Sequence, residues 1–162
     1  MNTAARLLKS KESIIVAAVV LLSALGATTA GAQQILFAQI GSAPPMNSNQ
    51  FVDIPGLSFL LPAASAGHTQ ALIILDIPQP YATGNNFPGA KFGINVGGTV
   101  VADGGFTYSM QVPASSGRMP TTVVVRVPLA NTPRLVRAQW ISYRNSTGRI
   151  DSFASLSAIL GN

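Results

Sequence analysis

The stretch VPASSGRMP, residues 112–120, places an arginine beside two serines in a loop that contains two prolines. Only 9% of the chain is charged, so a guanidinium stands out in a turn that needs little more than Gly117. The simplest interpretation of Arg118 is a solvated turn. The alternative is a ligand contact, because arginine supplies forked hydrogen-bond donors and the neighbouring hydroxyls supply acceptors.

Similar polar side chains gather in other expected loops and strand ends. Sugar hydroxyls need donors and acceptors together, and tyrosine adds an apolar face with a polar tip. Composition alone equally allows these side chains to satisfy hydrogen bonds at strand ends. The set is Tyr81, Asp103, Thr107, Tyr108, Ser115, Ser116, Arg118, Arg144, Asp151 and Ser152.

Catalytic and metal-binding groups are scarce. His68 is the single histidine, no Gly-x-Ser-x-Gly elbow accompanies it, and no cysteine is present. Four scattered aspartates are the only acidic residues after position 32, and they form no Asp-x-Asp-x-Asp calcium loop. The sequence therefore favours a binding protein over an enzyme, with no cofactor and no metal.

The first 32 residues have the pattern of a secretory signal peptide. Three basic residues precede a short apolar run, residues 14–25, and the small-residue stretch GATTAGA follows. The run is shorter than the roughly 20 residues of a membrane span, although an uncleaved anchor is the alternative. We expect cleavage after Ala32, or after Ala30. Residues 33–162 should then form one exported domain, secreted or periplasmic, with no membrane span.

The charge balance of residues 33–162 argues against nucleic acid as a partner. Seven basic side chains face four aspartates, and no dense cluster of lysines and arginines could follow a phosphate backbone. An exported domain without cysteine has no disulfides to supplement its core. With 48% apolar residues, the chain is expected to bury further surface against copies of itself.

Short β-branched or alternating runs separated by Gly, Pro and Asn predict an all-β domain. So many short strands in one domain favour a two-sheet β-sandwich or jelly roll. The strands are expected at residues 35–40, 50–54, 57–61, 70–77, 91–96, 98–102, 105–111, 121–128, 134–143 and 149–160.

Two of these strands carry a distinctive pattern. Residues 121–128 place Val123, Val125 and Val127 on one face, which predicts one strongly apolar side. Residues 149–160 are small or apolar on both faces. A strand covered on both sides fits a subunit interface as well as it fits a core.

Six segments, in order, resemble the tumour-necrosis-factor-like (TNF-like) fucose-binding lectin domain, the N-terminal half of a bacterial two-domain superlectin. The resemblance covers nearly all of the chain after the leader. The segments are FVDIPGL (51–57), PYATGNNFPG (80–89), VVADGGFTYS (100–109), VPASSGRMP (112–120), AQWISYRNS (138–146) and IDSFASLSAIL (150–160).

The resemblance implies a jelly-roll homotrimer with calcium-free fucose sites between neighbouring subunits, and fucosylated glycans as partners. One subunit is expected to contribute Thr107, Tyr108, Arg144, Asp151 and Ser152. Its neighbour is expected to contribute Tyr81, Ser115, Ser116 and Arg118, so that Arg118 would cross a subunit boundary to meet the sugar.

The chain departs from the family pattern at three positions. Lys91 stands where the family has a tyrosine, Arg149 where it has a histidine, and Ser116 where it has a threonine. We keep Lys91, Arg149 and the nearby Asp103 as further candidates for contacts with a glycan. A structural or protein-binding trimer whose sugar site has decayed is the alternative function. The chain also ends at Asn162, before the calcium-dependent domain of the superlectin, so a stand-alone lectin is expected.

Overall fold

The computed structural model describes residues 33–110 and 117–162. Within these ranges the regular elements are strands. They are β1 (Ile35–Ile40), β2 (Ala43–Met46), β3 (Val52–Leu61), β4 (Gln70–Ile77), β5 (Pro80–Thr83), β6 (Gly89–Val96), β7 (Thr99–Thr107), β8 (Thr121–Pro128), β9 (Arg134–Tyr143), β10 (Thr147–Ile150) and β11 (Ala154–Gly161).

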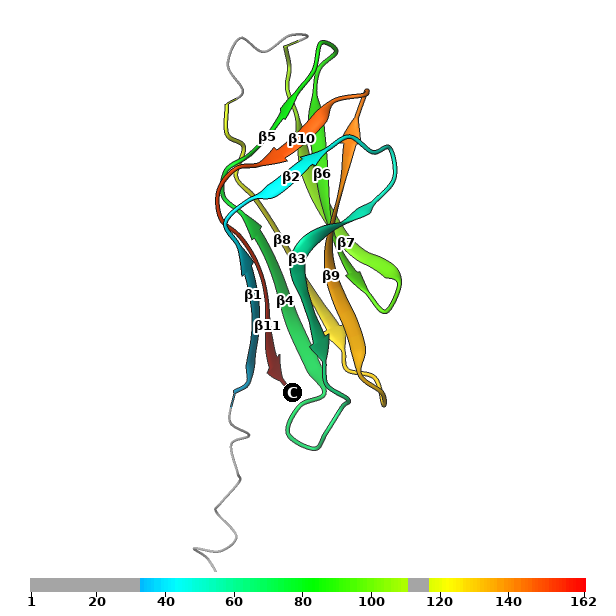
Figure 1. The fold of residues 1–162 in the computed structure, drawn as a ribbon. Coiled ribbons are helices and arrows are strands. Elements are labelled where there is room, and N and C mark those ends of the chain that lie inside the picture. Colours follow the sequence, from blue (N-terminus) through cyan, green and yellow to red (C-terminus); the bar gives the residue numbers. More distant parts are fainter. Residues whose placement is uncertain (1–32, 111–116) are drawn as a thin grey trace, which may run out of the picture. The chain divides into compact units, whose positions relative to one another are not determined.

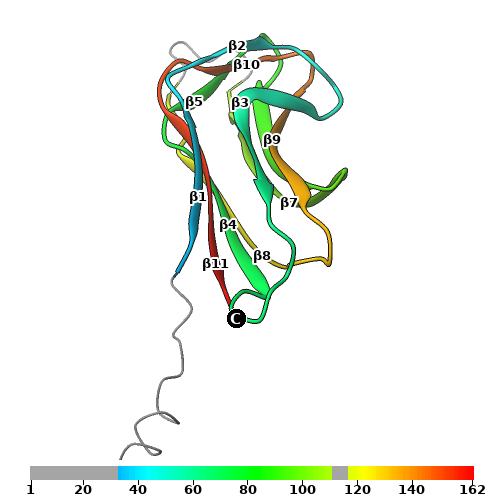
Figure 2. The same cartoon turned by 60° about the horizontal axis from the view of Figure 1, so that its bottom comes forward.

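The strands form two four-stranded sheets and one small sheet. One large sheet has the order β1-β11-β4-β8, and the other has the order β3-β9-β6-β7. These two sheets face each other, and the three-stranded sheet β2-β10-β5 crosses one end of the sandwich (Figures 1 and 2). This arrangement confirms the predicted all-β sandwich.

The core lies between the two large sheets and follows from strand alternation. In β4, Ala71, Ile73, Leu75 and Ile77 are completely buried, while the residues between them are half-exposed. Strand β6 lies between β9 and β7, and all of its residues except Lys91 are buried.

Four strands have the predicted bounds: 35–40, 70–77, 121–128 and 134–143. Two predicted pairs instead form single strands. Residues 50–54 and 57–61 join in β3, where the pairing register with β9 shifts between Asp53 and Ser58. Residues 99–107 form β7, so the Asp-Gly-Gly segment between the predicted strands 98–102 and 105–111 lies within one strand, which ends at Thr107.

The small sheet contains two strands, β2 and β5, that the sequence patterns did not predict. Both β2 and β5 carry prolines and lie at its edges, where a missing N–H costs no ladder hydrogen bond. The predicted strand 149–160 divides into β10 and β11, which belong to different sheets. The break between them, residues 151–153, is where two predicted site residues lie.

The structure shows which faces of β8 and β11 are buried. Val123 and Val127 are buried and Val125 is half-buried, as predicted for the apolar face of β8. In β11, Leu156 is completely buried in the core, whereas Ile159 is half-exposed on the outer face. Only the outer face of β11 therefore remains available to a partner.

The expected leader, residues 1–32, lies outside the described residues, so its cleavage stays a prediction. No helix among residues 33–110 and 117–162 is long and apolar enough to cross a membrane.

The close approach of β6 and β7 generates a stability prediction. A Cβ at Gly105 would lie 2.2 Å from the carbonyl oxygen of Ala90 and 2.6 Å from Cα of Lys91, and backbone atoms cannot move aside cheaply. We expect Gly105→Ala to lower the free energy of unfolding by roughly 2–3 kcal/mol in urea denaturation. The control is Gly41→Ala, whose Cβ would meet nothing within 4 Å. Equal effects of the two substitutions would contradict this account.

Candidate functional site

The predicted site residues that the structure describes fall mainly into two groups, near the end of the sandwich where β5 and β10 lie (Figure 1). The first group, the Arg118 cluster, comprises Tyr81, Tyr108, Arg118 and Asp151. The second group, the Arg144 cluster, comprises Thr107 and Arg144 with the neighbouring Phe87 and Tyr143.

In the Arg118 cluster, one carboxylate accepts from two side chains. The hydroxyl of Tyr81 donates to Oδ2 of Asp151 at 2.6 Å, and Arg118 lies 3.5 Å from the same oxygen. The guanidinium also reaches the backbone oxygen of Gln79 at 3.4 Å and lies 4.0 Å from the centre of the Tyr81 ring. Arg118 is therefore held by an anion, a carbonyl and an aromatic face at once.

Strand pairing explains why these residues meet. Tyr81 lies on β5 directly opposite Arg149 on β10, and Asp151 follows two residues after Arg149. The short β10 strand thus brings the carboxylate to the phenol. Arg149 is half-buried on this strand, and its charge acts to lower the pKa of Tyr81.

Two tyrosines of the Arg118 cluster keep their protons well above neutral pH. The pKa of Tyr81 is raised above its usual value, first by its hydrogen bond to Asp151. The pKa of Tyr108 is raised chiefly by burial, and its hydroxyl donates to the backbone oxygen of Gly117. Both phenols are therefore hydrogen-bond donors under physiological conditions.

The Arg144 cluster surrounds a shallow pocket of about 390 Å³, lined by Thr107, Tyr143 and Arg144. Thr107 and Tyr143 flank Gly89 across the sheet, and Thr107 packs so closely that a Cβ on Gly89 would lie 2.7 Å from its Oγ1. The guanidinium of Arg144 donates to the backbone oxygen of Phe87 at 3.4 Å. The Phe87 ring centre lies 5.5 Å from Cζ of the arginine.

An ion pair borders the Arg144 cluster. Nζ of Lys91 lies 2.8 Å from Oδ1 of Asp103, and this hydrogen bond raises the pKa of Lys91 above its usual value. A neighbouring pocket of about 260 Å³ is lined by Lys91 together with Thr107 and Tyr143. Lys91 is therefore protonated, and its charge is balanced by Asp103 of the same chain.

The two clusters lie on different faces of the chain. Thr107 ends β7, and its exposed side chain lies on the face opposite that of the buried Phe106. Thr107 is exposed beside the Arg144 cluster, whereas Tyr108 is half-buried and packs edge-on against Phe106 at 5.4 Å. Among the described residues, no side-chain hydrogen bond or ion pair joins the two clusters.

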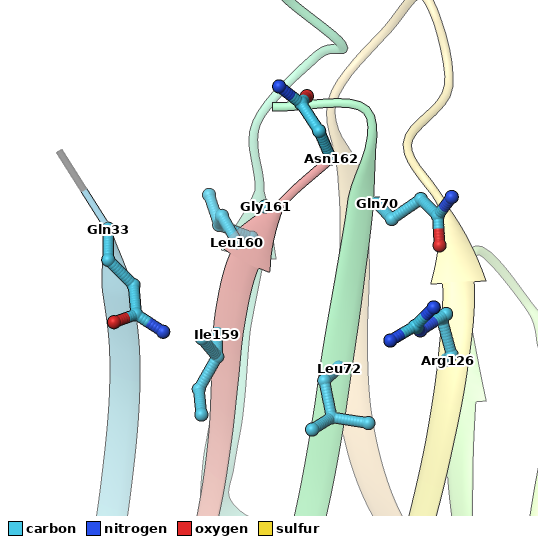
Figure 3. A pocket seen from close by; sticks show the side chains of 8 residues that line it. All are labelled: Gln33, Gln70, Leu72, Arg126, Ile159, Leu160, Gly161 and Asn162. Atoms are coloured by element: carbon cyan, nitrogen blue, oxygen red, sulfur yellow. The ribbon is translucent and has the colours of Figure 1, made fainter. Parts of the chain in front are cut away.

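A further pocket, of about 240 Å³, lies on the outer face of the β1-β11-β4-β8 sheet (Figure 3). In Figure 3 the Arg126 side chain extends from β8 toward Leu72, and the Gln33 amide extends toward Ile159. The lining residues are Gln33, Gln70, Leu72, Arg126, Ile159, Leu160, Gly161 and Asn162. None of the site residues predicted from the sequence lines this pocket.

A comparison with protein families matches residues 37–159 to the family described as "Bc2l-C, N-terminal domain". The chain belongs to this family. The Bc2l-C N-terminal family is a family of TNF-like lectin domains, so both the resemblance and the jelly-roll fold class deduced from the six segments are confirmed. A comparison with curated protein sequences finds no match.

Solved structures similar to this chain are distant in sequence. One is described as "EclA C-terminal domain; sugar-binding protein", with 12% identity over 75% of this chain and 78% of that one, and a TM-score of 0.39. "Structure of Eiger TNF from S. frugiperda" has 8% identity, coverage of 79% and 92%, and a TM-score of 0.39. The VP2 subviral particle of infectious bursal disease virus has 10% identity, coverage of 82% and 34%, and a TM-score of 0.50.

Some family-derived expectations remain predictions. Ser115 and Ser116 lie outside the described residues. Ser152 is described, and its Oγ is buried without a hydrogen-bond partner among the described atoms. The resemblance assigned Asp151 and Tyr108 to one subunit and Tyr81 and Arg118 to the next, whereas these four side chains lie together within a single chain.

Three residues near the Arg144 cluster were not among the candidates predicted from the sequence. Tyr143 lines both pockets beside Thr107, Phe87 contacts Arg144, and the buried Ser146 anchors the turn that carries Arg144. Tyr143 and Ser146 flank Arg144 within the AQWISYRNS segment, which was the available signal. Nothing in the sequence near Phe87 indicates its partner, because 57 residues separate it from Arg144.

Proposed function

We propose that this chain is an exported lectin that binds fucose or fucosylated glycans, without calcium, at sites shared between the subunits of a homotrimer. The single observation that carries the proposal is the pair of arginines, Arg118 and Arg144, each held against an aromatic ring with part of its guanidinium free. Membership of a lectin family supports carbohydrate binding, and the N-terminal sequence pattern supports export.

The chemistry of the two clusters suits a neutral deoxysugar. Arg118 and Arg144 supply donors, whereas Asp151, Thr107 and the phenol oxygens of Tyr81 and Tyr108, whose protons are donated within the chain, supply acceptors. Sugar hydroxyls require both kinds of group. The ring of Tyr81 adds an apolar surface for C–H groups. Because the clusters face different sides of one chain, a site using both arginines would take one from each of two neighbours.

An exposed apolar face supports the trimer. On the outer side of the β1-β11-β4-β8 sheet, Ile35, Phe37 and Val124 are 64%, 60% and 53% exposed. The cross-strand register places Ile159 and Ile74 between them on the same face. Contiguous exposed apolar surface of this kind is typical of a protein–protein interface.

The pairing of the aspartates supports binding without calcium. Asp53 accepts from Arg137 and Gln139, and Asp76 accepts from Thr122. Asp103 and Asp151 are engaged by Lys91 and by the Arg118 cluster. Among the described residues, no three acidic or histidine side chains gather where they could hold a metal ion.

One observation favours the alternative of a structural or protein-binding trimer with a decayed sugar site. Lys91 stands where the family has a tyrosine, and its ion pair with Asp103 leaves neither side chain fully free for a ligand. An aromatic wall for the sugar is thereby lost at this position.

The proposed ligand is tested by a glycan array that carries fucosylated glycans and their fucose-free counterparts. We expect selective binding of the fucosylated set, unchanged in the presence of a divalent-metal chelator. Binding of neither set would favour the structural alternative. Loss of binding in the chelator, with recovery on addition of calcium, would contradict the metal-free site.

The proposed trimer is tested by light scattering. We expect the wild-type chain to have three times the mass of one subunit. Ile159→Asp should dissociate it, because burying an unpaired carboxylate in an apolar interface is strongly unfavourable. The matched control, Leu135→Asp, changes an exposed leucine on the outer face of the other large sheet and should leave the trimer intact. A stable wild-type monomer would refute the trimer and the shared site together.

The two arginines should contribute separately to fucoside affinity. A hydrogen bond from a charged donor contributes about 1.5–3 kcal/mol, and about 1.4 kcal/mol is a factor of ten. Arg118→Ala or Arg144→Ala should therefore weaken binding roughly tenfold or more in calorimetry. Arg134→Ala is the control, because Arg134 begins β9 and Arg144 follows its far end, roughly 30 Å away along the strand.

Mixed trimers test whether the site is shared. Subunits carrying Arg118→Ala are exchanged with subunits carrying Arg144→Ala. If neighbours each supply one arginine, some mixed trimers contain an intact site and binding partly returns. Trimers that exchange subunits but never recover binding would exclude the shared site.

A further inference from the structure

The turn that carries Arg144 has an unusual backbone. Arg144 and Asn145 have φ values of 52° and 57°, and the N–H of Ser146 donates to the carbonyl of Tyr143 at 2.9 Å. A turn with positive φ at both central residues favours Asn, Asp or Gly. An arginine at the first of these positions is energetically unfavourable, because the backbone conformation favours a different residue type there. The arginine is therefore explained by its side chain and not by its backbone.

Ser146 fixes this turn to the sheet. Its side chain is buried, and Oγ lies 2.8 Å from the carbonyl oxygen of Gly89 and 2.5 Å from that of Tyr143. The N–H of Gly89 donates back to the same hydroxyl at 3.3 Å. The backbone of Arg144 is therefore held between the end of β9 and the start of β6, and only its side chain remains to be oriented.

Phe87 provides that orientation. Its carbonyl accepts from NH1 of Arg144, and its ring centre lies 5.5 Å from the guanidinium carbon. Phe87 itself has a φ of 47°, which is rare for a bulky residue, and the residue is 37% exposed, outside the hydrophobic core. A strained, exposed phenylalanine gains little from core packing, whereas a guanidinium on its ring gains a cation–π contact.

We propose that Phe87 is a positioning residue for Arg144: it holds the guanidinium in the orientation that meets the sugar. This inference rests on the proposed function. A free arginine side chain loses rotamer freedom when it binds a ligand, and one that is already oriented loses less. Phe87 thereby raises affinity without contacting the sugar itself.

The first experiment measures affinity for methyl α-fucoside by calorimetry. Phe87→Leu keeps an apolar side chain but removes the aromatic face, and should weaken binding about two- to fivefold. Phe87→Tyr keeps the aromatic face and should bind as the wild type does. Thermal unfolding of each variant checks that the domain remains folded.

The decisive comparison repeats Phe87→Leu in an Arg144→Ala background. If Phe87 acts through Arg144, the second substitution should have no further effect on affinity. An equal loss in both backgrounds would mean that Phe87 contacts the sugar or a neighbouring subunit directly, and would overturn the proposal. An unchanged affinity of Phe87→Leu in the wild-type background would overturn it as well.

A second measurement needs no ligand and separates this inference from the proposed function. In an NMR spectrum of the ¹⁵N-labelled protein, the Nε–Hε signal of Arg144 is identified by its absence from Arg144→Ala. A guanidinium above a ring is shifted upfield, so Phe87→Leu should move this signal toward the position of a free arginine, and Phe87→Tyr should not. If wild-type protein binds no fucoside, the proposed function fails but this contact is still tested. A signal that Phe87→Leu leaves in place overturns the positioning of Arg144 by Phe87.

Discussion

The buried hydroxyl of Ser146 is the contact on which the geometry of the Arg144 cluster depends. It bridges the start of β6, the end of β9 and the start of β10, and so ties a large sheet to the small sheet. Strand ends normally fray because their last backbone groups lack partners. Here those groups are satisfied inside the protein, so the turn that carries Arg144 is attached to a fixed end of the sandwich.

Charged side chains are scarce in this chain, so Arg118 has few charged partners. Its carboxylate is engaged by a phenol and a guanidinium, which leaves few ways for Arg118 to rotate. An arginine that is already hydrogen-bonded is a better neutral-ligand donor than a mobile one, because less conformational freedom is lost on binding. Lys91 is likewise paired within its own chain, because its charge is balanced by Asp103.

The absence of cysteine and the exposed face of the β1-β11-β4-β8 sheet are connected. The chain has no disulfide to stabilise it, and its core is confined between two four-stranded sheets. Ile35 and Phe37 lie outside that core, on the far side of the sheet from Leu36 and Ala38, which pack inward. Association through this face would cover the exposed side chains.

The sequence by itself determined the class of fold and the bounds of four strands, and it supplied the candidate site residues, whose roles stay predictions. Strands such as 70–77 and 121–128 were predictable because alternation is a local property. Tertiary structure alone decided that β2 and β5 exist, that Asp103 lies within a strand, and that Tyr81 meets Asp151. Edge strands with prolines lack the local pattern, and a glycine pair is a turn or a strand according to what packs against it. Contacts such as Phe87 with Arg144 join residues far apart in the chain, and only strand pairing brings such residues together.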